Sequence, residues 1–154
     1  MIKYLLLISC FFSCVSSRKL IDGYSVIRYK EHIGVSSEIQ DYLLDVPKGG
    51  RLIKQNSGDG YRQYVVQFSD SSIVYIMNDS WSGSRLNIQN RYNSNIMSIN
   101  RKSNSDTLIF SGKQKNGNYW KEKILGKIVV GYVNVNPSEK QVYDTSIESI
   151  RIYK

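Results

Sequence analysis

The sequence predicts an α+β fold: one domain, mostly antiparallel β-sheet, with a short N-terminal helix and a C-terminal helix packed on the sheet. Composition is the first reason. The 154 residues include 12 Tyr, many Ile and no Ala, and Ile and Tyr favour strands whereas Ala is the best helix former. The second reason is periodicity, because most apolar stretches alternate with a period of two and only two stretches follow the helical period.

The N-terminus has the organisation of an export signal. Met1 to Lys3 is a short positive region, and Tyr4 to Phe12 is a mostly apolar stretch. That length suits a secretory hydrophobic region and is about half of what a membrane span needs. The alternative is that residues 4–12 form a buried first strand or helix.

Two cysteines follow, each directly after a serine. Residues 7–10 read Leu-Ile-Ser-Cys, and residues 11–14 read Phe-Phe-Ser-Cys. Both resemble the lipobox of bacterial lipoproteins, in which a cysteine after a small residue is lipidated when the signal peptide is cleaved. The resemblance covers about the first 19 residues. We expect the lipid on Cys14, because this choice leaves a hydrophobic region of normal length, and Cys10 is the second choice.

Cleavage after Ser17, without a lipid, is a third option. With Cys14 as the anchor, residues 1–13 are the signal peptide, 14–19 a lipid-anchored tether and 20–154 a single β-rich domain. The chain has no cysteine after Cys14, so we expect this domain to fold without a disulfide.

The strands are predicted from alternation and from the turn residues between them. Gly58-Asp59-Gly60 and the Asn116-Gly117 pair mark turns, and Asn-Gly is a strong hairpin signal. The stretch 127–135 is apolar on both faces, which predicts a central strand. We expect strands at 24–29, 51–55, 63–68, 73–77, 86–88, 96–99, 107–110, 119–124 and 127–135.

The N-terminal helix is predicted over residues 37–46. Its apolar residues have the spacing i, i+3, i+4 and i+7, Ser37 could cap it, and Pro47 would end it. These apolar residues are Ile39, Tyr42, Leu43 and Val46. A strand over 42–46 is the alternative.

The C-terminal helix is predicted over residues 137–150. Pro137 suits the first helical position and Asn136 suits the N-cap. The residues that can share one apolar face are Val142, Tyr143, Ile147 and Ile150.

The net charge of +8 is concentrated within residues 85–127, where nine Lys and Arg accompany only Asp106 and Glu122. Such a region either protects strand edges against pairing or meets an anionic partner. Aromatic and Arg residues dominate binding hot spots. We therefore expect a binding face formed by Trp81, Arg85, Arg91, Tyr119, Lys121 and Lys123, with Trp120 on the opposite, core-facing side of its strand.

Catalytic motifs are sparse. His32 is the only histidine, it has no identifiable partner, and there is no Gly-x-Ser-x-Gly motif. The pairs Asp41/Asp45 and Asp59/Asp70 have no spacing that selects them as catalytic carboxylates. Phosphate loops, dinucleotide fingerprints and metal-ligand spacings are also absent from the sequence, so we expect no cofactor, no metal and no enzymatic activity.

These features together indicate an exported, lipid-anchored binding protein that faces the periplasm or the cell surface. Its most concrete form is an immunity-type protein that binds and neutralises a toxin. One alternative is an envelope lipoprotein that binds an anionic glycan or lipid through the basic region, and another is a hydrolase. A nucleic-acid partner is disfavoured, because export would separate the protein from nucleic acid.

Overall fold

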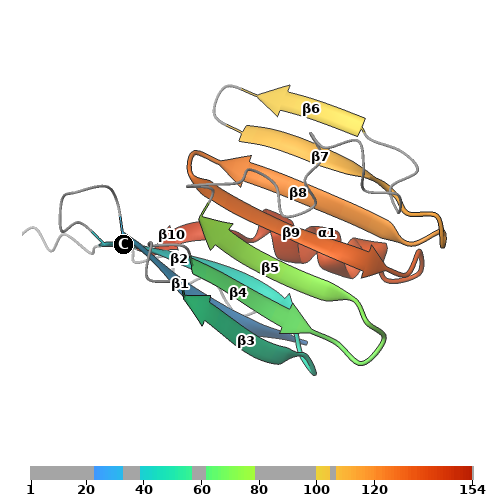
Figure 1. Cartoon of the computed structure of the whole chain (residues 1–154), viewed down its shortest axis with the longest axis horizontal. Helices are drawn as coiled ribbons and strands as arrows, with labels where there is room; N and C mark the ends of the chain where they lie inside the picture. Colours follow the sequence, from blue (N-terminus) through green and yellow to red (C-terminus); the bar gives the residue numbers. More distant parts are fainter. Residues whose placement is uncertain (1–22, 33–38, 57–61, 79–99, 105–106, 154) are drawn as a thin grey trace, which may run out of the picture.

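A computed structural model describes residues 23–32, 39–56, 62–78, 100–104 and 107–153. Within these residues the chain forms two antiparallel sheets and one helix (Figure 1). The elements are β1 (Tyr24–His32), β2 (Ile39–Pro47), β3 (Arg51–Asn56), β4 (Arg62–Gln67), β5 (Ile73–Asn78), β6 (Asn100–Asn104), β7 (Thr107–Lys113), β8 (Tyr119–Leu125), β9 (Ile128–Val135), α1 (Lys140–Glu148) and β10 (Arg151–Tyr153).

The larger sheet has the strand order β3-β4-β5-β9-β8-β7-β6. Its middle strand is β9, which confirms the central position predicted for this apolar stretch. Ile128, Val129 and Val130 are all fully buried there, as expected of a strand covered on both faces. The predicted hairpin between β4 and β5 is also confirmed, with Val65 opposite Tyr75 in its register.

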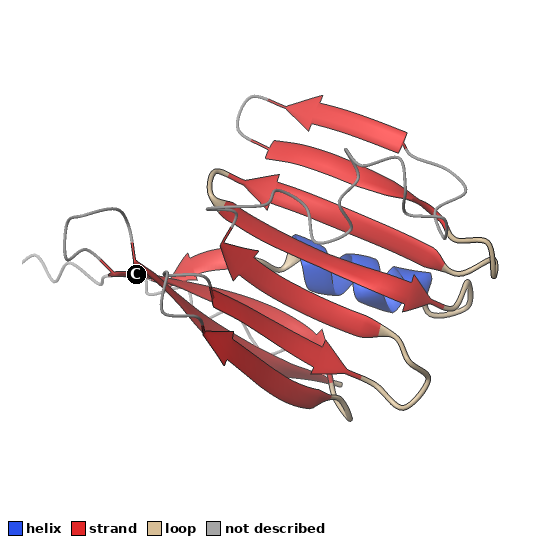
Figure 2. Ribbon diagram, viewed as in Figure 1, coloured by secondary structure: helices blue, strands red, loops and turns tan. Residues whose placement is uncertain are grey.

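The smaller sheet, β1-β2-β10, and helix α1 lie on the same side of the larger sheet (Figure 2). The main core lies between them. Ile27 and Leu44 from the small sheet, Ile76 and Val130 from the large sheet, and Ile147 from α1 belong to one buried cluster. A second cluster, on the opposite face of the large sheet, contains Val65, Tyr75, Met77 and Val129.

The predicted N-terminal helix is wrong, because residues 39–47 form strand β2. The α+β description with two helices therefore becomes two antiparallel sheets with one C-terminal helix. Tyr42 and Val46 fit the helical spacing, but with Leu44 they also fit a period of two. Leu44 and Val46 are buried in the core, and all nine residues of β2 pair with β1. Pairing with the preceding strand β1 thus overrides a locally helical pattern.

The C-terminal helix packs on the large sheet as predicted, although it is shorter than 137–150. Tyr143 and Ile147 are buried, whereas Val142 is 41% exposed. The Ser146 hydroxyl donates to the carbonyl of Asp45 at 2.6 Å, which ties the helix to β2. The side chain of Asn136 accepts a hydrogen bond from the backbone N–H of Ser138, so it stabilises the turn before the helix. The N-cap is Glu139 and not Asn136 as predicted.

Some predictions concern residues outside the described ranges. These are the signal segment with Cys10 and Cys14, the turn at 58–60 and the strands at 86–88 and 96–99. Strand β2 matches the alternative of a strand over 42–46, and two further strands were not predicted at all, β6 and the short β10, which pairs with β2. No helix in the described part of the chain is long and apolar enough to cross a membrane.

Candidate functional site

A cleft lies where α1 meets the large sheet. The helix contacts β9 and β8, and strand β7 extends the sheet beyond them (Figure 1). The helix side and the exposed part of the sheet form a hollow of about 460 Å³, within the size range of ligand sites. Its described lining is Ile109, Ser111, Gly112, Lys113, Tyr119, Trp120, Lys121, Tyr132, Lys140, Asp144 and Glu148, and we call it the α1–β7 cleft.

The helix wall of the cleft is charged because of its residue spacing. Lys140, Asp144 and Glu148 follow one another at intervals of four, so they lie on one side of α1. Tyr143 and Ile147, one position before Asp144 and Glu148, point instead into the core. The same helix therefore anchors itself with one face and lines the cleft with the adjacent one.

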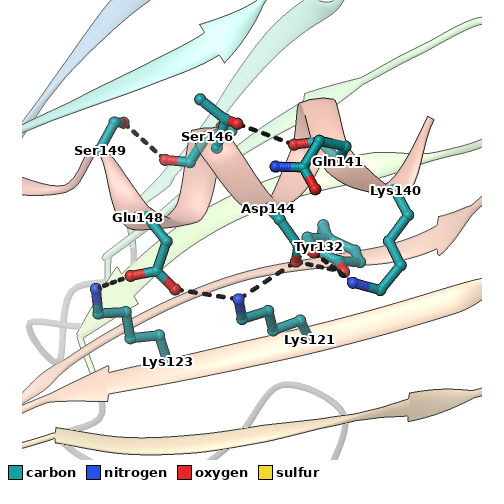
Figure 3. Close-up of polar contacts among 10 residues, drawn as sticks. Lys121, Lys123, Tyr132, Lys140, Gln141, Asp144, Ser146, Glu148 and Ser149 are labelled. Carbon is teal, nitrogen blue, oxygen red and sulfur yellow. Dashed lines mark hydrogen bonds and ion pairs between the residues drawn. The ribbon is translucent and has the colours of Figure 1, made fainter.

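Two lysines of β8 form ion pairs with the carboxylates of this helix wall (Figure 3). The Lys121 ammonium lies 3.0 Å from a Glu148 carboxylate oxygen and 3.3 Å from Asp144. Lys123 lies 2.6 Å from the other Glu148 oxygen, and Lys140 pairs with Asp144 within the helix. We call these five residues the ion-pair seam. The side chains of Lys121 and Lys123 are only 15% and 14% exposed.

The seam keeps its carboxylates ionised. Burial alone would raise the pKa of Asp144, but the hydrogen bond from Lys140, the charge of Lys121 and the hydrogen bond from the Tyr132 hydroxyl outweigh it and lower that pKa. Burial alone would also raise the pKa of Glu148, but the hydrogen bonds from Lys123 and Lys121 outweigh this effect and lower that pKa. Burial and the Asp144 charge raise the pKa of Tyr132, so this hydroxyl stays protonated and donates to Asp144 at 2.9 Å.

Tyr119 forms the aromatic element of the cleft. Tyr119 and Lys121 are two positions apart on β8, so alternation turns both toward the same side of the sheet, and the register shift beside them places an extra residue in β9. Two ammonium groups approach the Tyr119 ring: Lys113, from the facing position on β7, lies 5.1 Å from its centroid, and Lys140, from α1, lies 5.6 Å away. Both distances fit cation–π contact.

The structure brings together half of the residues predicted for the binding face. Tyr119 and Lys121 line the α1–β7 cleft, and Lys123 is beside it in the seam. Tyr119 is half-buried, although alternation predicts an exposed side chain. Trp120 is fully buried, as predicted. Trp81, Arg85 and Arg91 lie outside the described residues.

Sequence reasoning missed four residues of the site: Lys113, Lys140, Asp144 and Glu148. The spacing of four along α1 was a usable signal for three of them, because it places them on one side of the helix. His32 is the last residue of β1, where its backbone pairs with Ile39. Within the described ranges, no group of three or more His, Cys, Asp or Glu residues is arranged to hold a metal ion.

No known protein family, curated protein or solved structure matches this chain.

Proposed function

We propose that the chain is an exported, lipid-anchored binding protein and that the α1–β7 cleft is its binding surface. The observation that carries this proposal is a cleft in which Tyr119 contacts Lys113 on β7 and Lys140 on α1, and which Lys121 on β8 also lines. Aromatic rings with cationic groups around a concave site are typical of recognition surfaces.

The state of the carboxylates favours binding over proton transfer. A general acid needs a pKa near the working pH, whereas Asp144 and Glu148 have lowered pKa values and lie in ion pairs. They are suited to accept hydrogen bonds from a ligand. We infer that the protein acts without turning over its partner.

The sequence favours a protein partner. In its most concrete form the chain is an immunity-type protein that neutralises a toxin in the periplasm, because a lipid anchor and one small domain suit that task. A second candidate partner is an anionic glycan or lipid of the envelope. The concave shape and the charged lining of the α1–β7 cleft favour this second candidate, since protein hot spots usually have an apolar centre.

The anchor is tested by metabolic labelling with a palmitate analogue in cells that produce the full chain. We expect labelling of the wild type and none of Cys14→Ser. Labelling that disappears only in Cys10→Ser would move the anchor to the earlier cysteine. Labelling that survives both substitutions would contradict lipid anchoring.

The binding surface is tested by capturing the partner from envelope extract and titrating variants against it. Truncation of a hot-spot aromatic costs about 2 kcal/mol or more, so Tyr119→Ala should weaken binding roughly 30-fold. The same loss is expected for Trp81→Ala or Arg91→Ala. His32→Ala should bind normally, and loss of function in His32→Ala with normal binding by Tyr119→Ala would favour a hydrolase instead.

A further inference from the structure

Strand β3 leaves one edge of the large sheet open. It is the first strand in the order of that sheet, so it pairs with β4 on one side only (Figure 1). We infer that this edge binds an extended segment of a partner protein by strand addition, and that the segment has the pattern acidic-apolar-apolar-acidic. No residue of β3 belongs to the described lining of the α1–β7 cleft, so this is a second surface that goes beyond the proposed function.

The open edge is regular and exposed. All six residues Arg51–Asn56 pair with β4 in one unbroken register. Five of them are exposed, and the sixth, Ile53, is half-buried. At about 3.3 Å per residue the edge is about 20 Å long. Alternate residues of an antiparallel edge strand direct their N–H and C=O groups away from the sheet, so β3 offers a template with which an extended chain can pair.

Two other edge strands are less suited to strand addition. At the edge of the small sheet, the Arg62 guanidinium donates to the backbone carbonyl of Lys30 on β1 at 3.1 Å, which takes up one of the backbone acceptors of that strand. Strand β10 has only three residues. In the described part of the chain, β3 has neither of these restrictions.

The side chains of β3 specify which segment fits. Two apolar residues, Leu52 and Ile53, lie between two cations, Arg51 and Lys54. Neither cation has a carboxylate partner among the described residues, and strands β3 and β4 contain no Asp or Glu. Lys54 lies over the Tyr64 ring, 5.1 Å from its centroid, which orients the side chain but does not neutralise its charge.

An added strand places one residue opposite each residue of β3, and side chains that face each other across the pair interact. A segment with acidic residues at positions i and i+3 can therefore place one carboxylate beside Arg51 and the other beside Lys54, on opposite faces of the sheet. The two residues between them meet Ile53 and Leu52, which is 42% exposed. Backbone hydrogen bonds give such a complex its affinity, and the side chains give it its selectivity.

The same charges disfavour another occupant of this edge, a second copy of β3. Two β3 strands would bring Arg51 and Lys54 of both copies together, and like charges across a pair of strands destabilise it. Lysines on edge strands commonly prevent self-association in this way. An acidic segment converts this repulsion into attraction, so the cations both protect the edge and select its partner.

The test titrates the full-length chain, in detergent, with the hexapeptide Thr-Glu-Val-Val-Glu-Thr. We expect binding that weakens as salt is added, because the charges involved are exposed. A control peptide with Gln in place of both Glu should bind about fivefold more weakly. A third peptide keeps both Glu and carries N-methyl groups on both valines. Consecutive N–H groups of a strand point to opposite sides, so one of the methyl groups faces β3, and this peptide should not bind.

Hydrogen exchange locates the bound peptide. The N–H groups of β3 that face away from β4 should exchange quickly in the free protein and become protected when the acidic peptide is added. Arg51→Gln combined with Lys54→Gln should weaken binding about fivefold. Lys127→Gln is the matched control, because Lys127 is an exposed lysine in the turn between β8 and β9, and it should bind like the wild type. Circular dichroism of each variant separates loss of binding from loss of fold.

Several results would overturn the strand-addition site. Equal binding of the Glu and Gln peptides would show that charge does not select the segment, and binding of the N-methylated peptide would show that no strand is added. Protection outside β3, or no binding of the acidic peptide, would remove the site altogether. A dimer of the free protein with protected β3 amides would make a second copy the occupant. None of these results involves the α1–β7 cleft, which the partner-capture experiment tests separately.

Discussion

The Tyr75 hydroxyl on β5 donates a hydrogen bond to the buried carboxylate of Glu122 on β8, although β9 lies between these two strands. Gly131 makes this contact possible. It is the residue of β9 that pairs with Tyr75 on one side and with Glu122 on the other. The Tyr75 ring lies directly over it, in the place where any other residue would have a side chain. The contact links three central strands of the sheet that carries the cleft.

Gly131→Ala should destabilise the domain. The added methyl would lie 2.5 Å from the Tyr75 hydroxyl oxygen and 2.7 Å from the carbonyl oxygen of Lys121, so the strands would have to shift. We expect the free energy of unfolding to fall by about 1–3 kcal/mol, the usual cost of overpacking, measured by urea denaturation. In a Tyr75→Leu background the substitution should cost less. An equal cost in both backgrounds would show that Tyr75 is not the reason for a glycine here.

Helix α1 is held mainly by its apolar face. Ile147 is fully buried in the main core, so Ile147→Ala should lower the free energy of unfolding by about 2–5 kcal/mol. Val142 is on the same helix and 41% exposed, so Val142→Ala is the matched control and should change stability by less than about 1 kcal/mol. Similar losses for both variants would contradict the packing described for α1.

The ion-pair seam adds a second attachment of α1. Lys121→Gln removes the ammonium group that contacts both Asp144 and Glu148, and we expect it to cost about 1–2 kcal/mol of stability. Lys127→Gln, an exposed control of the same type, should be nearly neutral. Equal unfolding midpoints for the two variants would mean that the seam contributes nothing measurable to stability.

The seam also predicts how stability depends on pH. The pKa values of Asp144 and Glu148 are lower in the folded protein than their ordinary values of 3.8 and 4.5. Their contribution is therefore complete above about pH 6 and is lost as the pH falls through the ordinary values and then the lowered ones. Asp144→Asn should lose less stability than the wild type between pH 6 and pH 3 in urea titrations. If Asp144→Asn lost as much stability as the wild type, groups other than Asp144 would cause the acid sensitivity.

Most strands could be predicted, because their cause is local. The β4–β5 hairpin follows from alternation and a polar turn, and β9 follows from an apolar run. The error at β2 arose because Tyr42 and Val46 satisfy both the helical and the strand period, and pairing with β1 decides between them. The residues of β2 alone do not show that it will pair with β1.

The candidate site was predictable only in part for the same reason. Charge and alternation identify Tyr119, Lys121 and Lys123 on one face of β8. Asp144 and Glu148, the carboxylates that neutralise these lysines, lie more than 20 residues later, on α1. Only the packing of the helix on the sheet shows that Lys121 and Lys123 belong to the ion-pair seam and that Lys113 and Lys140 both approach the Tyr119 ring.

We propose that a partner binds in the α1–β7 cleft, and site-specific photocross-linking in the producing cells tests this most directly. A diazirine amino acid replaces Ser111, which lines the cleft, or Ser69, which is exposed in the turn between β4 and β5. We predict an adduct from position 111 that disappears when Lys113→Gln and Lys140→Gln are combined, and none from position 69. The same adduct from both positions, or an adduct at position 111 that survives the double lysine substitution, would contradict the claim.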